Sequence, residues 1–174
     1  MYLPTHPQAL GVSNNRVVIS PARKEWCVML EFAADVKVNR PVADVFAWLT
    51  NPENQGKFDK SSLKMEALTP GPWRTGTQFR ELRDLGGRKT EVLSEIAELE
   101  PNRRFVVRSK TGPGWLGVWE FEPDGNSTRL HWTGQMRMKG FGRLLEPLIG
   151  RQMHPAIAQQ FARLPTLIES EIAQ

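Results

Sequence analysis

Three residues in the middle of the chain carry groups that could do acid–base or nucleophilic chemistry. Glu81 and Arg83 follow Phe79 at two-residue steps within TGTQFRELRD, so their side chains should share one face of a β-strand. A carboxylate and a guanidinium on that face could act as a general base or an anion-binding pair. Ser94 has the same inward parity in the next predicted strand. The simpler alternative is that Glu81 and Arg83 reach the rim of the sheet and are solvated, because the turn LGG follows closely.

The remaining reactive residue types give no further candidate. His131 alternates with Leu130 and Trp132 and should point to the outer face of its strand, and His154 directly precedes Pro155. No histidine–carboxylate spacing resembles a metal site or a catalytic triad, and no phosphate loop or dinucleotide motif is present. The single cysteine, Cys27, lies among strand-forming residues and is expected to be a packing residue. The sequence therefore predicts no metal, no cofactor and no specific reaction.

Composition places the chain among soluble, single-domain proteins. The 174 residues are 40% hydrophobic, and no apolar run approaches the length of a membrane span, so we expect a cytoplasmic protein. Basic residues number 23 against 19 acidic ones, and the two signs are interspersed. This pattern indicates a mixed solvated surface and no nucleic-acid partner, although a net charge of +4 would allow weak contact with an anionic membrane surface. Nothing in the sequence indicates the oligomeric state.

Patterning divides the chain into an arm, residues 1–24, and one folded domain, residues 25–174. The arm is rich in polar residues and proline and is predicted to be disordered or to add an edge strand. Strict alternation from Trp26 to Val38 then predicts a long half-buried strand. Asn39 as a cap and Pro41 in the first turn predict a short helix, and Asn51-Pro52 starts a second one. Six more strands follow, in SSLKMEALT, TGTQFRELRD, RKTEVLSEIAEL, RRFVVRSK, GWLGVWEFEP and STRLHWTGQMRM; their short connectors indicate an antiparallel meander.

The last third of the chain, residues 141–174, has the pattern of a long amphipathic helix. Its apolar residues recur at steps of three or four and form a stripe consisting of Leu145, Ile149, Met153, Ile157, Phe161, Leu164, Ile168 and Ile172. Prolines lie inside this pattern, so we expect a bent helix or two collinear pieces joined near Gly150 and Pro155. The stripe requires a curved sheet as its partner surface.

Several segments resemble the START-related, birch-pollen-allergen-like (SRPBCC) superfamily, particularly its bacterial polyketide cyclase/dehydrase and lipid-transport branch. VKVNRPVADVFAWLTNPEN is similar to the family's first strand and helix, RTGTQF to the glycine before its third strand, and SEIAELEPNRRF to the end of its fourth. WEFEPDGNSTRLHW resembles its closing hairpin, and GRLLEPLIGRQM with FARLPTLIES its terminal helix. The similarity covers roughly residues 27–172. Leu164-Pro165 departs from the family's usual leucine-lysine pair, and residues 1–24 have no counterpart in it.

This resemblance implies an α+β helix-grip fold, in which a curved seven-stranded antiparallel sheet surrounds a long C-terminal helix and encloses a cavity. The expected polar lining includes Thr90 and Ser109 beside Glu81, Arg83 and Ser94. Gly117, between inward-facing Trp115 and Trp119, indicates space for a ligand. The predicted ligand-binding residues are Phe79, Val92, Phe105, Val107, Trp115, Gly117, Trp119, Trp132, Met153, Ile157 and Phe161. The alternative is that these side chains fill a solid core.

Three functions are compatible with this reading. The first is binding or transport of a small hydrophobic ligand, such as a lipid, an isoprenoid or a polyketide-like aromatic. The second is a cyclase/dehydratase-type enzyme that acts on a hydrophobic or polyketide-like substrate, with Glu81, Arg83 and Ser94 as candidate catalytic residues. The third is a protein-interaction domain, for which an exposed apolar patch would be the sign.

Overall fold

The computed structural model describes residues 28–84, 87–112, 114–138 and 146–172. The arm 1–24, Cys27 and the predicted helical residues 141–145 therefore lie outside the described residues. The strands are β1 (Val28–Val38), β2 (Ser62–Ala67), β3 (Gln78–Asp84), β4 (Lys89–Glu100), β5 (Arg104–Ser109), β6 (Gly114–Asp124) and β7 (Ser127–Met138). The helices are α1 (Val42–Leu49), α2 (Pro52–Phe58) and α3 (Glu146–Ile172).

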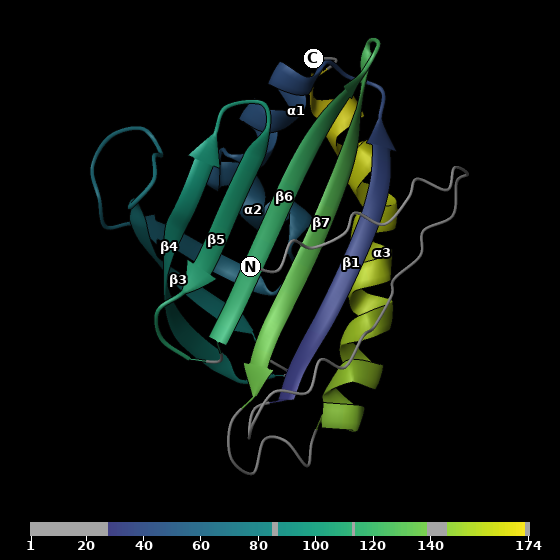
Figure 1. Ribbon diagram of the computed structural model, residues 1–174. Helices are drawn as coiled ribbons and strands as arrows, with labels where there is room; N and C mark the ends of the chain where they lie inside the picture. The colour runs from purple at the N-terminus through teal and green to yellow at the C-terminus, as the bar shows by residue number, and fades with distance from the viewer. Residues whose placement is uncertain (1–27, 85–86, 113, 139–145, 173–174) are drawn as a thin grey trace, which may run out of the picture.

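The described strands form one antiparallel sheet in the order β1-β7-β6-β5-β4-β3-β2, and α3 runs beside β1 (Figure 1). Strands β2 to β7 are a meander, whereas β1 pairs with β7 and so lies at the opposite edge from β2. Tight turns join the strands, with Asn102 (φ 60°) between β4 and β5 and Gly125 (φ 63°) between β6 and β7. This arrangement confirms the predicted helix-grip fold. No helix in the described ranges is long and apolar enough to cross a bilayer.

The two short helices form where the sequence predicts them. In α2, Asn51 Oδ1 accepts a hydrogen bond from the Glu53 N–H (3.0 Å), as an N-cap residue should. In α1 the N-cap is Pro41, so the prediction of Asn39 as the cap is wrong. The Asn39 side chain instead accepts a hydrogen bond from Ser127 Oγ (3.3 Å), which ties it to β7 and not to the helix end.

Helix α3 is one continuous helix of 27 residues. Of the two predicted alternatives, a bent helix or two collinear pieces, the second is therefore wrong. Pro155 is exposed, so the carbonyl group that lacks its usual N–H partner is on the side of the helix that water can reach. Gly150 is no joint either, because it lies inside this continuous helix. A Cβ atom placed on it would make an ordinary contact of 3.6 Å with Leu30, so a methyl group would fit there and a larger side chain would meet β1.

Hydrogen bonds hold the C-terminal turns of α3 against α1 and α2. Glu171 Oε2 accepts from Trp48 Nε1 (3.1 Å) on α1 and from Lys57 Nζ (2.7 Å) on α2. These hydrogen bonds, Lys57 first, hold the pKa of Glu171 below its ordinary value. Glu169 Oε1 accepts from the backbone N–H of Asn39 (2.7 Å). Polar contacts as well as packing therefore fix the end of α3 to the last turns of α1 and α2 and to the segment before α1.

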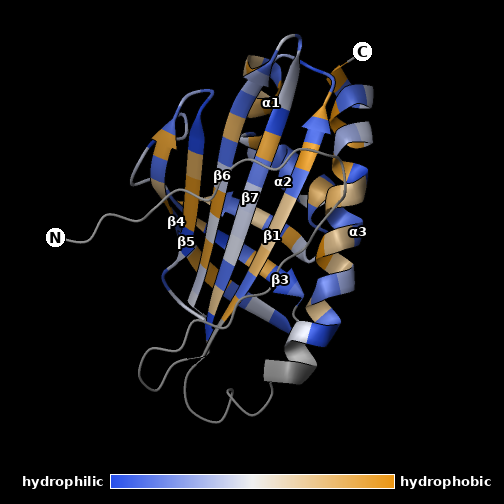
Figure 2. Cartoon of the chain, turned by 45° about the vertical axis from the view of Figure 1, so that its right-hand side comes forward, coloured by the Kyte–Doolittle hydropathy of each residue, from blue (hydrophilic) through white to orange (hydrophobic). Residues whose placement is uncertain are grey.

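Hydrophobic and hydrophilic residues alternate along the strands (Figure 2), and side-chain burial follows the predicted alternation. On β1, Leu30, Phe32, Ala34 and Val38 are buried. From α3, Phe161, Leu164 and Ile168 are each at most 2% exposed, and they pack with the inward side chains of the sheet in one core. The outer face carries ion pairs, such as Arg80 with Glu91 (2.7 Å). All three helices contribute buried residues to the same core.

His131 lies on the outer face of β7, as predicted, between two carboxylates. Its Nδ1 contacts Asp35 on β1 and its Nε2 lies 3.5 Å from Glu122 on β6. Desolvation acts to lower the pKa of His131, but the hydrogen bond to Asp35 and the charges of both carboxylates outweigh it and raise the pKa. The protonated imidazole is thus stabilised in the folded state.

We predict that this cluster makes stability depend on pH near neutrality. A raised folded-state pKa means that the stabilisation is complete below the unfolded-state value and is lost as pH rises through the folded-state value. Because 40% of the His131 side chain is exposed, the stabilisation by this cluster should not exceed about 1 kcal/mol. In urea denaturation from about pH 6 to pH 8, the free energy of unfolding should decline less with rising pH for His131→Gln than for the parent. Parallel curves would contradict the prediction.

Candidate functional site

The concave face of the sheet holds a cluster of aromatic rings. Phe161 of α3 lies 4.7 Å from Trp132 and 5.6 Å from Trp119, measured between ring centroids. Phe58 of α2 meets Phe161 edge-on at 5.4 Å. Trp115 extends the cluster along β6, with its ring 6.0 Å from that of Trp132. Contacts of this kind stabilise beyond the area that they bury, and they present flat apolar surfaces.

Two paired glycines let the indoles approach the backbone of the sheet. Gly117 on β6 pairs with Gly134 on β7. A Cβ atom placed on Gly134 would lie 2.5 Å from Cη2 of Trp132 and 2.8 Å from Cη2 of Trp115, so no side chain fits there unless these rings move. At Gly117 the nearest atoms are the indole nitrogens of the same two residues, at 3.5 and 3.7 Å. A methyl group would fit at Gly117, but a larger side chain would meet an indole.

The inner surface is incompletely covered near the start of α3. Trp115 on β6, Met136 on β7 and Met153 on α3 pack against the core, yet each is only half-buried. His154 is half-buried beside them, and its ring lies 5.4 Å from that of Phe32. We call these four residues, Trp115, Met136, Met153 and His154, the mouth. A hydrophobic ligand could contact side chains here without displacing the core.

His154 supplies the mouth with an imidazole nitrogen that has no hydrogen-bond partner among the described residues. Its Nε2 is buried and makes no hydrogen bond to any described residue. Buried polar atoms are nearly always satisfied, so an unpaired imidazole nitrogen indicates a place where a bound molecule could supply the partner. The sequence alone gives no role to His154, the residue before Pro155. Its spacing of four from Gly150 and three from Ile157, both buried, was the available signal for the inner face.

Trp73, from the loop between β2 and β3, supplies another unpaired polar atom. Its ring stacks on Phe79 (5.7 Å) and on Phe105 (5.8 Å). Its Nε1 is buried without a hydrogen-bond partner among the described residues. The sequence predicts only a connector at Trp73, because loop residues carry no periodic signal.

Glu81 and Arg83 do come together, and they form an ion-pair network with the segment after α2. Both carboxylate oxygens of Glu81 accept from Arg83 Nη1 (3.2 Å each). Arg83 Nη2 bonds to Asp59 and to Ser61 Oγ (2.6 Å). Desolvation acts to lower the pKa of Arg83, but the charges of Asp59 and Glu81 raise it above its ordinary value. Glu81 is 5% exposed, so the alternative of a solvated pair at the rim is wrong for this carboxylate.

The network limits what Glu81 can do as a base, because its oxygens are already occupied by a guanidinium. Ser94 is buried on β4 and pairs in register with Phe79, while Val92 pairs with Glu81. Ser94 is therefore on the same inner face as Glu81, two register pairs away from it. Ser109 Oγ accepts a hydrogen bond from the Trp115 N–H (2.7 Å), and Thr90 is half-buried.

The predicted ligand-binding residues all lie on the concave side. Eight of them are buried: Phe79, Val92, Phe105, Gly117, Trp119, Trp132, Ile157 and Phe161. Val107, Trp115 and Met153 are half-buried. The structure thus separates the set into side chains that build the core and side chains that a ligand could reach. Whether any of them binds a ligand stays a prediction.

Most of the chain matches one known protein family. A model of the family described as "Polyketide cyclase / dehydrase and lipid transport" matches residues 29–169. The chain belongs to this family. No curated protein matches it significantly. The match covers all described elements almost in full and leaves out the arm.

Solved structures share the fold of this polyketide cyclase/dehydrase and lipid transport family member. A protein from Thermus thermophilus has a TM-score of 0.68 at 22% identity, over 81% of this chain and 98% of that chain. The Zhui aromatase/cyclase from a Streptomyces species has 0.65 at 18%, over 83% and 96%. Norcoclaurine synthase from Thalictrum flavum has 0.62 at 15%, over 85% and 99%. At such identities the similarity shows the fold, and a fold does not specify an activity.

We predict unequal effects of alanine at the two paired glycines. Gly134→Ala should lower the free energy of unfolding by about 1–3 kcal/mol, because its methyl group would overpack against two indoles. Gly117→Ala should change it by less than about 1 kcal/mol, because its contacts have ordinary lengths. Urea denaturation followed by far-UV circular dichroism measures both. Equal losses would show that the indoles yield as easily at one position as at the other.

We also predict that breaking the buried Glu81–Arg83 ion pair lowers the free energy of unfolding more than breaking an exposed ion pair does. Arg83→Met leaves Glu81 buried without its cation and should cost about 2–3 kcal/mol, less than a fully buried pair because 25% of the Arg83 side chain is exposed. Adding Glu81→Leu should recover much of the loss. The matched control is Arg80→Met, whose exposed pair with Glu91 on the outer face should cost less than about 1 kcal/mol. Equal costs at positions 80 and 83 would contradict the role of burial.

Proposed function

We propose that this protein binds a small hydrophobic ligand between the sheet and α3, at the mouth. The observation that carries the proposal is the group of half-buried, inward-facing side chains there, Trp115, Met136 and Met153, beside the unpaired Nε2 of His154. An indole offers a flat apolar surface, and methionine adapts to irregular shapes. Lipids, isoprenoids and polyketide-like aromatics all fit this chemistry.

His154 narrows the ligand class to hydrophobic molecules with one polar group. An imidazole nitrogen can donate or accept a hydrogen bond, so a hydroxyl, phenol or carbonyl oxygen would satisfy it. Its neighbour Phe32 is fully buried, which makes this end of the site poorly hydrated. A ligand without a polar group would leave Nε2 unpaired, and a buried unpaired group costs free energy.

A cyclase/dehydratase activity on a polyketide-like substrate is the second candidate, and His154 is the residue that favours it. An imidazole beside an apolar surface can move a proton to or from a bound carbonyl compound. The Glu81–Arg83 network supports this activity less well, because both oxygens of Glu81 are occupied by Arg83. The similarity in fold to an aromatase/cyclase is consistent with either function.

We predict that His154 distinguishes ligands by their polar group. The probes are 1-naphthol and naphthalene, and binding is followed by quenching of tryptophan fluorescence. His154→Leu should weaken 1-naphthol binding roughly tenfold, equivalent to about 1.4 kcal/mol for one lost hydrogen bond, and leave naphthalene nearly unchanged. The control His131→Gln, on the outer face, should alter neither affinity.

Equal weakening of both probes would mean that His154 serves packing, and absence of quenching in the parent would refute binding at the mouth. Native mass spectrometry of the purified protein would then show whether a ligand is retained from the host cell. Incubation with a poly-β-ketone thioester and analysis for cyclised product tests the second candidate, and loss of product in His154→Leu with retained binding would support it.

A further inference from the structure

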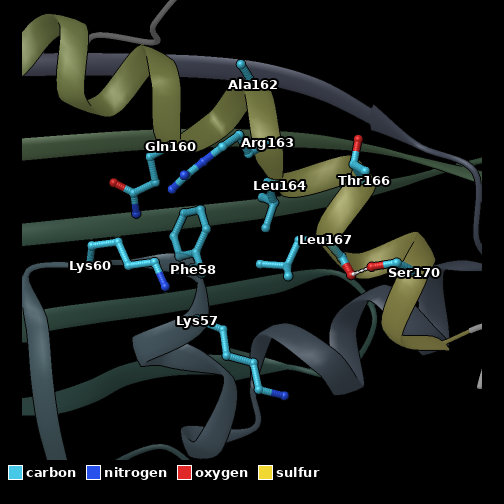
Figure 3. A pocket seen from close by; sticks show the side chains of 10 residues that line it. All are labelled: Lys57, Phe58, Lys60, Gln160, Ala162, Arg163, Leu164, Thr166, Leu167 and Ser170. Atoms are coloured by element: carbon cyan, nitrogen blue, oxygen red, sulfur yellow. Dashed lines mark hydrogen bonds between the residues drawn. The ribbon is translucent and has the colours of Figure 1, made fainter.

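A second concave surface lies outside the sheet, in a groove between α2 and α3 (Figure 3). Its volume is about 460 Å³, within the size range of small-molecule sites. The residues that line it come from α2, from the segment that follows and from the C-terminal half of α3: Lys57, Phe58, Lys60, Gln160, Ala162, Arg163, Leu164, Thr166, Leu167 and Ser170. None of them contributes to the mouth.

The groove has an apolar floor and a basic rim. Phe58 and Leu164 are 6% and 0% exposed, and Leu167 is half-buried, so the floor is recessed. Lys57, Lys60 and Arg163 stand around it, whereas the lining contains no carboxylate. Lys57 is paired with Glu171 (2.7 Å). Lys60 and Arg163 are exposed and form no ion pair with a described residue, so both cations can meet an external anion.

We propose that this groove binds a single-chain anionic amphiphile, with its apolar chain on Phe58 and Leu167 and its carboxylate between Lys60 and Arg163. Charge complementarity selects an anion, and the apolar floor selects a hydrophobic tail. The recessed floor favours one entering chain over a flat bilayer surface, which would reach only the rim. The groove shares no lining residue with the mouth. The Phe58 ring packs against Trp119 (5.5 Å) and Phe161 and so stands between the groove and the aromatic cluster of the core.

The test compares ligands that differ only in the charged end. Isothermal titration calorimetry with decanoate, decanol and decyltrimethylammonium should show the tightest binding for decanoate. The two ions are used below their micelle concentrations and decanol below its solubility limit. Lys60→Glu/Arg163→Glu should weaken decanoate binding roughly tenfold, equivalent to about 1.4 kcal/mol, and leave decanol nearly unchanged. Raising the salt concentration should weaken decanoate binding to the parent, because exposed charges are screened.

The matched control is Lys64→Glu/Arg88→Glu, which makes the same change in net charge at two exposed residues outside the groove. It should leave decanoate affinity within roughly twofold of the parent, a difference of about 0.4 kcal/mol. Equal weakening by both double variants would overturn the proposal in favour of overall charge attraction. Amide shift changes in NMR spectra should map to α2 and the residues 160–170 of α3.

Two further outcomes would overturn the proposal. Shift changes confined to Trp115, Met153 and His154 would place decanoate at the mouth, which would support the proposed function while refuting the groove. Binding of phosphatidylglycerol vesicles that depends on Lys60 and Arg163, without binding of decanoate, would identify the groove as a membrane contact instead. The His154→Leu variant, measured in parallel, should bind decanoate as the parent does if the two sites are independent.

Discussion

The packing of α3 into the concave face of the sheet is the contact on which the other features depend. Phe161 stands at its centre, where its ring meets Trp119 and Trp132 from the sheet and Phe58 from α2. Burial of the helix stripe explains why α3 stays continuous past two prolines, since the apolar contacts along the stripe outweigh the hydrogen bonds that the prolines remove. The same contact separates the aromatic cluster from the outer groove, because Phe58 packs against the cluster and also forms part of the floor of the groove.

Much of the fold could be predicted from the sequence, because strand alternation and helix periodicity are local signals. The inward positions on β1, from Leu30 to Val38, follow directly from the two-residue period. The short turn-forming connectors predict the antiparallel meander, and the resemblance to the SRPBCC superfamily predicts the overall topology, which the strand order confirms. The role of Gly150 could not be predicted, since proximity to Leu30 depends on how the helix lies against an edge strand far away in the sequence.

The site was predictable only in part. Parity placed Glu81, Ser94 and the tryptophans on the inner face, but it could not show that Asp59, 24 residues before Arg83, completes the ion-pair network. Nor could it show that Trp115 and Trp132 converge over Gly134, because close approach to a backbone is a property of packed rings and not of spacing. The spacing of His154 indicates an inward position, but the contact of its ring with Phe32 depends on how α3 packs against β1, far away in the sequence.

The position of β1 has a consequence for biosynthesis. β1 pairs along its whole length with β7, and the loop that follows it bonds to Glu169 across 130 residues, so the first described strand requires the last ones. On the ribosome, the strand and both short helices emerge long before their partners and must wait with apolar side chains uncovered. Closure of the sheet and its covering by α3 can occur only after nearly the whole domain has left the exit tunnel. Because of this strand order, we expect a chaperone to cover the exposed apolar side chains of the nascent chain during translation.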